Sequence, residues 1–125
     1  MTSTHKDLIV WQQSMNIAVD VYSITRDFPK SEEFGLVSQM RRAVVSIPSN
    51  IAEGYGRGSR KELQHFLEIS VGSASELETQ VLISKRIGYM DTDVADDFCE
   101  KLNQIIKMLS SLIQRCKENV VYRQK

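Results

Sequence analysis

The stretch from Ser49 to Ser59 reads SNIAEGYGRGS and carries three glycines beside Arg57. Glycine-rich segments hold phosphate groups when they lead from a strand into a helix and leave backbone N–H groups free. Neither phosphate-binding pattern, G-x-G-x-x-G or G-x-x-x-x-G-K-[ST], is present here. The glycines also follow a predicted helix instead of a strand. We therefore interpret the stretch as a helix–helix turn, in which residues 54–58 unwind one helix and Ser59 caps the next.

Few residues have the types and spacing needed for metal binding or catalysis. His65 is followed by Glu68, which reverses the Glu-x-x-His order of helical di-iron sites, and the pattern occurs once. Glu53, Glu76 and Glu78 are candidate acid–base groups, but the sequence indicates no substrate cleft for them. We expect no metal, no cofactor and no enzymatic activity. An enzyme that uses these glutamates is the least favoured alternative.

Size and charge limit the possible classes of protein. A chain of 125 residues suits one domain with one core, and we assign residues 1–125 to it. Its 16 basic and 16 acidic residues give a formal net charge of zero, whereas a duplex-DNA-binding protein usually has a basic excess. No apolar run approaches the ~20 residues that span a membrane, and the N-terminus lacks a secretory signal. We expect a cytoplasmic protein with no membrane partner.

The two cysteines, Cys99 and Cys116, have no metal-ligand spacing. Both fall in one predicted helix, ~25 Å apart at 1.5 Å per residue, so they cannot form a disulfide with each other. We interpret them as free thiols, with Cys116 packed in the core.

Apolar periodicity predicts four helices, over residues 7–27, 32–55, 60–87 and 93–118. Short connections and the lack of any strand pattern indicate an all-α fold, an antiparallel up-down four-helix bundle. Pro48 lies inside the second helix and removes one backbone donor, so we expect a kink there. The third helix is apolar on nearly all sides, and we expect it to be the most buried.

The first helix has two apolar faces. One is formed by Leu8, Trp11, Met15, Ala18, Tyr22 and Thr25, and the other, nearly opposite, by Val10, Ile17, Val21, Ile24 and Phe28. A helix with two such faces buries both, and a chain of this length offers few partners for the second. We therefore predict a homo-oligomer. A helix at the centre of a monomer is the alternative.

Polar residues accompany the apolar ones on the second and third helices. They are Gln39, Ser46, Asn50 and Glu53 on the second, and Ser73, Glu76 and Gln80 on the third. Buried polar groups need hydrogen-bond partners, so we expect the two sets to pair, with Arg42 or Arg57 neutralising a glutamate. Such a network would fix helix register or a subunit contact. A functional site on facing helices is the alternative.

Basic residues gather near the glycine turn and in the middle of the second helix. Arg57, Arg60 and Lys61 lie where the third helix begins and where free backbone N–H groups favour anions. With Arg41 and Arg42 they are our candidates for nucleic-acid contact, to phosphates and without base specificity. A solvated loop is the alternative for the turn.

Three stretches together resemble a known family. They are DLIVWQQSM at residues 7–15, VYSITRDFPKSEEFGLVSQMRRAVVSIPSNIAEGYGRGSRKE at 21–62, and FLEISVGSASELETQV at 66–81. The chain resembles, over about residues 6–118, the four-helix-bundle proteins known from intervening sequences of 23S ribosomal RNA genes. The resemblance implies a bacterial four-helix bundle and a ring-like homopentamer, and it implies no catalytic residues. A similar bundle is the accessory protein of diversity-generating retroelements, where a basic pentamer binds nucleic acid and a partner reverse transcriptase.

These observations lead to one hypothesis and one alternative. We predict a non-enzymatic, self-associating bundle that acts as an RNA- or nucleoprotein-interacting module. The alternative is a structural adaptor for a protein partner, with no nucleic-acid contact.

Overall fold

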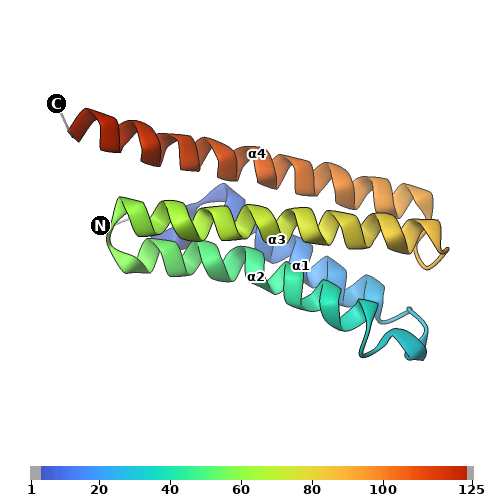
Figure 1. Cartoon of the computed structure of the whole chain (residues 1–125). Coiled ribbons are helices and arrows are strands. Elements are labelled where there is room, and N and C mark those ends of the chain that lie inside the picture. The colour runs from blue at the N-terminus through green and yellow to red at the C-terminus, as the bar shows by residue number, and fades with distance from the viewer. Residues whose placement is uncertain (1–3, 124–125) are drawn as a thin grey trace.

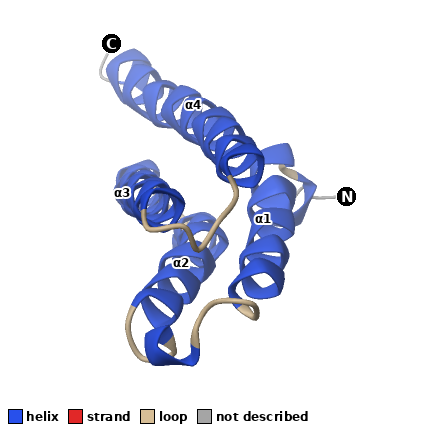
Figure 2. Cartoon of the chain, turned by 90° about the vertical axis from the view of Figure 1, so that its right-hand side faces the viewer, coloured by secondary structure: helices blue, strands red, loops and turns tan. Residues whose placement is uncertain are grey.

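The computed structural model describes residues 4–123, and it describes side chains as far as residue 118. Its helices, in chain order, are η1 His5–Asp7, α1 Ile9–Thr25, η2 Lys30–Glu32, α2 Leu36–Arg57, α3 Arg60–Arg86 and α4 Thr92–Arg123. There is no strand in this part of the chain, as Figure 2 shows. The predicted all-α class is therefore confirmed. None of these helices combines the length and the apolarity that crossing a membrane requires.

Successive long helices run in opposite directions, which can be followed along the colour gradient in Figure 1. The hydrogen bonds between α2 and α3 also show that these helices are antiparallel. Ser46 bonds to Ser73, and the next residue of α2, Ile47, accepts a bond from Ser70, which lies earlier in α3. α2 packs most extensively on α3, and α3 on α4, while α1 contacts the rest of the bundle least.

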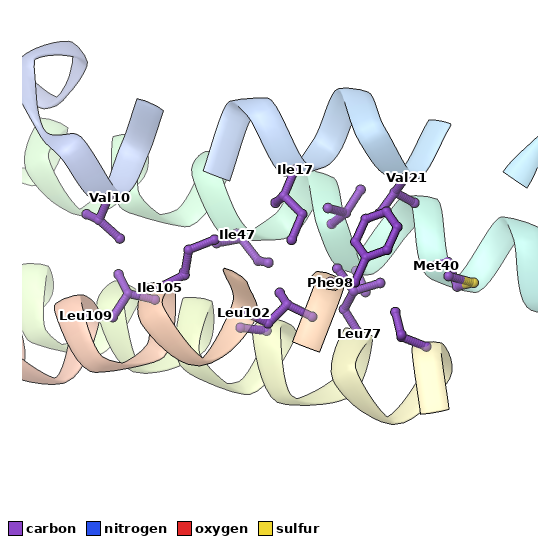
Figure 3. Close-up of a cluster of buried hydrophobic side chains, with 14 of the residues drawn as sticks. Val10, Ile17, Val21, Met40, Ile47, Leu77, Phe98, Leu102, Ile105 and Leu109 are labelled. Carbon is purple, nitrogen blue, oxygen red and sulfur yellow. The ribbon is translucent and has the colours of Figure 1, made fainter. Parts of the chain in front are cut away.

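The core is one cluster of buried side chains that all four long helices share (Figure 3). Its fully buried members include Ile17 and Val21 from α1, Met40 and Ile47 from α2, Leu77 from α3, and Leu102, Ile105 and Leu109 from α4. Burial of each such side chain contributes about 1.5–3 kcal/mol. Of the two apolar faces predicted on α1, the one with Ile17 and Val21 faces this core. Met15 and Tyr22, on the other face, remain exposed.

The connection before α2 contains a cap that the sequence did not suggest. α2 begins at Leu36, four residues later than predicted, and its N-cap residue Gly35 has no side chain to accept a bond. The Glu32 carboxylate takes this role, since it accepts the Leu36 N–H at 3.2 Å. The same carboxylate accepts a hydrogen bond from the Tyr89 hydroxyl at 3.1 Å.

The predicted unwinding of residues 54–58 is wrong. α2 continues through Gly54 and ends at Arg57, and Gly58 follows in the left-handed conformation with φ 85°. Gly54 is buried, and a Cβ atom there would lie 3.0 Å from Cβ of Phe66. The glycine therefore lets α2 and α3 approach closely inside the helix, while the turn itself needs only Gly58.

Ser59 caps α3, as predicted, by accepting the Glu62 N–H at 3.1 Å. At the other end of this helix, Gly88 adopts φ 86° immediately after the C-cap residue Ile87. Both ends of α3 therefore follow from residues visible in the sequence.

The expectation that α3 is the most buried helix is wrong, because α2 buries a larger share of its residues. Ile69, Leu82, Ile83 and Ile87 are between 37% and 52% exposed. The reason is that α3 packs on α2 and on α4, which leaves its remaining side open. Pro48 lies within the continuous α2 and is buried; a kink at this position stays a prediction.

Candidate functional site

The two predicted polar sets meet at the centre of the α2–α3 contact. The hydroxyl groups of Ser46 and Ser73 share a hydrogen bond of 2.7 Å. Asn50 donates its side-chain amide to the Ser46 hydroxyl at 2.9 Å and to the Ser46 carbonyl at 2.8 Å. These three residues therefore form a polar network between α2 and α3.

The other members of these sets do not all join the network, and whether they lie at a subunit interface stays a prediction. Gln39, Glu53 and Glu76 are exposed, because they lie beside the helix contact and not within it. Gln80 is buried, and its amide donates to Glu76 at 3.5 Å. The Oε1 atom of Gln80 has no partner among the described residues.

Glu53 and Glu76, two of the three candidate catalytic glutamates, do not form a pair. Glu53 accepts a hydrogen bond from Nε of Arg57 at 2.8 Å, so Arg57 neutralises a glutamate as predicted. The Ser46–Ser73 register places Glu76 about ten residues along the bundle from Glu53, or ~15 Å at 1.5 Å per residue. Carboxylates so far apart cannot share one proton-transfer step.

No metal-binding arrangement occurs in the described part of the chain, where no three His, Cys, Asp or Glu residues are grouped. Burial raises the pKa of the Cys116 thiol. Burial, followed by the negative charges of Glu78 and Asp96, raises the pKa of Cys99. Neither cysteine is therefore an activated nucleophile, because a reactive thiol needs a lowered pKa.

The five candidate nucleic-acid contacts fall into two groups. Arg41 and Arg42 lie in the second turn of α2, and Arg57 lies at its end, ~22 Å further along the helix. Arg60 and Lys61 begin α3 next to Arg57. The sequence places all five in neighbouring segments, but the length of α2 between Arg42 and Arg57 keeps the two groups apart.

Contacts within the chain hold one arginine of the first group in place. Arg41 donates to the Thr25 hydroxyl at 3.0 Å and to the Tyr22 carbonyl at 3.3 Å. Its guanidinium group lies 4.6 Å from the centre of the Tyr22 ring. Arg42 is exposed and makes no ion pair with any side chain that the structure describes.

In the second group, Arg60 lines a pocket of about 450 Å³ between the end of α2 and the start of α3. Arg57 lies over the Phe66 ring at 5.2 Å in addition to its bond with Glu53. The Nε atom of Arg60 is buried and has no partner within the described residues.

Sequence reasoning missed a groove of about 710 Å³ along the outer side of α2. Its lining includes Tyr22 of α1, Phe34 from the connection before α2, and Arg42 and Val45 of α2. The Phe34 side chain is 90% exposed. An aromatic residue between Glu33 and Gly35, outside every predicted apolar stripe, was the signal that could have indicated this surface.

Two of three comparisons with known proteins found similarity to this chain. The model of the 23S rRNA-intervening sequence protein family matches residues 6–111. A crystal structure of a protein of unknown function from the S23 ribosomal protein family of Bacteroides thetaiotaomicron is similar, with 26% identity and a TM-score of 0.76. The similarity covers 84% of this chain and 98% of that one. No curated protein matches the chain. Because the family model spans most of the sequence, the chain belongs to the 23S rRNA-intervening sequence protein family.

Proposed function

We propose that this protein is a non-enzymatic helical bundle that self-associates as a homopentamer in the cytoplasm, and that the oligomer contacts RNA or a nucleoprotein. The observation that carries the proposal is the outer face of α1. Self-association explains that face, and the basic residues of α2 and α3 supply the contact with RNA.

The outer face of α1 is unusually poor in charge for a surface helix. Asp20 is the one charged residue among the 17 of α1, and its carboxylate lies 3.9 Å from Nζ of Lys101 on α4. Ile9 and Val19 are 63% and 67% exposed, and Met15 is 42% exposed. A solvated helix normally presents charged side chains on its outer face. Exposed apolar residues without charged neighbours are typical of an interface between subunits.

The pentameric number rests on the resemblance to the family described above. A ring is the closed form of an interface in which one surface of each copy meets a different surface of the next. The exposed isoleucines and leucine of α3 are a second apolar surface that such an interface could use.

Light scattering coupled to gel filtration tests the assembly. We expect a mass near five times that of the 14.3 kDa chain at micromolar concentration. Val19→Lys should shift the mass towards that of the single chain, because it places a charge in the apolar face. Ile83→Lys tests whether α3 supplies the second surface. A single-chain mass for the unmodified protein contradicts the assembly.

The contact with RNA is proposed through the phosphate backbone. Arg41 and Arg42 form one basic group, and Arg57, Arg60 and Lys61 form the other. Phosphate contacts position a nucleic acid without reading its sequence, and their affinity falls steeply with salt. Binding of a structured RNA should therefore weaken as salt rises. Absence of binding at low salt, or an affinity independent of salt, contradicts this half of the proposal.

The second candidate is a structural adaptor for a protein partner, and the zero net charge favours it. A pull-down with the intact oligomer, with and without nuclease, separates the two candidates. Loss of captured proteins on nuclease treatment supports the nucleoprotein contact. Retention of the same proteins supports the adaptor.

A further inference from the structure

The groove on the outer side of α2 presents two aromatic rings at its edges. Phe34 is 90% exposed and lies at one end, in the connection that precedes α2. Tyr22 lies on α1, and the guanidinium group of Arg41 is stacked on its ring at 4.6 Å. Tyr22, Phe34 and Val45 all line the groove and are 40%, 90% and 42% exposed, so they form one exposed apolar patch, and such patches mark binding surfaces.

The polar groups that line the same groove suit an anion. Arg42 projects from α2 without an ion-pair partner among the described side chains, and Ser38 and Ser49 place hydroxyl groups along the same helix. Glu33 is the one carboxylate that lines the groove, against two arginines. The groove therefore has a local positive charge although the whole chain is neutral.

We propose that this groove binds a single-stranded segment of RNA, with one base stacked on Phe34 and a phosphate of the same segment held by Arg42. The inference rests on the RNA contact proposed above and names its site and the form of RNA. Unpaired bases stack on aromatic rings and on guanidinium planes. Both kinds of surface are present here, on Phe34 and on the stacked Arg41.

The small number of cations favours a single strand over a duplex. Two arginines neutralise few phosphates, and the second basic group lies ~22 Å away along α2. A duplex presents only its backbone and groove edges, so it would depend mainly on those charges. A single strand adds the stacking of its bases, for which every base offers a face.

A protein segment fits the groove less well. An apolar helix would cover Phe34 and Val45, but it would bury Arg42 without a partner unless it carried a carboxylate in register. A phosphate backbone supplies an anion at every nucleotide, so it needs no such register.

Fluorescence anisotropy with a labelled 12-nucleotide oligo(U) and a hairpin of equal length tests the proposal at low salt. We expect the unmodified protein to prefer the oligo(U). Phe34→Ala should weaken that binding about tenfold, the loss of one stacked base. Arg42→Gln should also weaken it, and should reduce the slope of log K against log salt by about 0.7, the value for one phosphate of a single strand.

Two controls separate the groove from general effects of charge and folding. Lys107→Gln removes one positive charge from an exposed position on α4 and should leave the affinity unchanged. Phe34→Trp in a Trp11→Phe background retains an aromatic ring and should restore binding, with its fluorescence quenched when oligo(U) stacks on it. Because Phe34 is exposed, its replacement should leave the helical circular dichroism unchanged.

Each remaining outcome overturns a definite statement. If the unmodified protein binds neither RNA, the proposed RNA contact fails and this inference fails with it. If RNA binds and Phe34→Ala and Arg42→Gln bind equally well, the contact stands and the groove is excluded. Preference for the hairpin overturns the single-stranded assignment. A change of oligomer mass in Phe34→Ala assigns the groove to a second copy of the chain.

Discussion

The Tyr89 hydroxyl donates a hydrogen bond to one oxygen of the Glu32 carboxylate at 3.1 Å, while the other oxygen accepts the Leu36 N–H at 3.2 Å. One carboxylate thus caps α2 and joins the connection after α1 to the turn between α3 and α4. Phe28 packs against the Tyr89 ring, with 5.4 Å between ring centres. The two loops at this end of the bundle are held together by these contacts.

The hydrogen bond between Tyr89 and Glu32 makes the free energy of unfolding vary with pH in the alkaline range. The hydrogen bond to Glu32, then burial, then the charge of Glu32 raise the pKa of Tyr89 above its ordinary 10.0. A raised folded-state pKa means that the folded state holds the proton more tightly than the unfolded chain. The resulting stabilisation is complete below pH 10 and is lost as the pH rises through the folded-state pKa. We expect the free energy of unfolding, measured in urea, to fall more steeply above about pH 10 for the unmodified protein than for Tyr89→Phe. If the free energy of unfolding falls with pH equally in both proteins, the hydrogen bond between Tyr89 and Glu32 does not form in solution.

The close approach of α2 and α3 at Gly54 predicts opposite effects for two glycine substitutions. A Cβ at Gly54 lies 3.0 Å from Cβ of Phe66, so Gly54→Ala should destabilise the fold by about 1–3 kcal/mol through overpacking. A Cβ at Gly72, in the middle of α3, meets no atom within 4 Å. Gly72→Ala should therefore stabilise the protein by about 0.5–1 kcal/mol, as alanine does in a helix. Urea denaturation measures both, and equal effects would contradict the close packing at Gly54.

The amide oxygen of Gln80, which has no partner among the described residues, predicts a stabilising substitution. Gln80 is 5% exposed, and a buried acceptor without a hydrogen bond costs about 1–3 kcal/mol. Gln80→Met keeps the length of the side chain and removes that acceptor, so the free energy of unfolding should rise by about 1 kcal/mol. Gln64→Met, on a more exposed part of α3, is the control and should have little effect. A destabilised Gln80→Met variant would mean that the amide has a partner in the assembled protein.

The raised thiol pKa values predict slow modification of both cysteines. At pH 8, Cys99 should react with a disulfide reagent more slowly than free cysteine, because burial and the nearby carboxylates keep it protonated. Cys116 is buried, so its reaction should follow unfolding. The reaction should therefore have two kinetic phases, and the single variants Cys99→Ser and Cys116→Ser show which cysteine gives each phase. Rapid reaction of Cys116 in the native protein would contradict its placement in the core.

The helices could be predicted from the sequence because their apolar periodicity is local. Ser59 and Gly88 also mark the ends of α3 by their own chemistry. The cap by Glu32 could not be predicted, since it depends on a turn that brings a carboxylate back to Leu36. Gly54 was misread for a related reason: a glycine that permits close helix packing has the same local pattern as one that ends a helix.

The candidate site was predicted less well than the fold. Residue types indicated Arg41, Arg42, Arg57, Arg60 and Lys61, but the distance between their two groups depends on where α2 ends. The exposure of Phe34 depends on which side of the η2 turn faces solvent, which no periodic pattern encodes. The pairing of Ser46 with Ser73 was predictable, because both lie beside an apolar stripe on helices that had to meet.

The separation of the two arginine groups along α2 has a consequence for how tightly any polyanion could be held. If the proposed RNA contacts form, each copy of the chain offers two points of attachment with at most three basic residues each, and so few charges hold a strand weakly as the salt concentration rises. In a homo-oligomer these points are repeated around the particle, and a strand released from one is recaptured by the next at a high effective concentration. The number of attachment points in the oligomer would then set how tightly the strand is bound. Dilution that separates the oligomer into single chains would release the strand without any change in the chain itself.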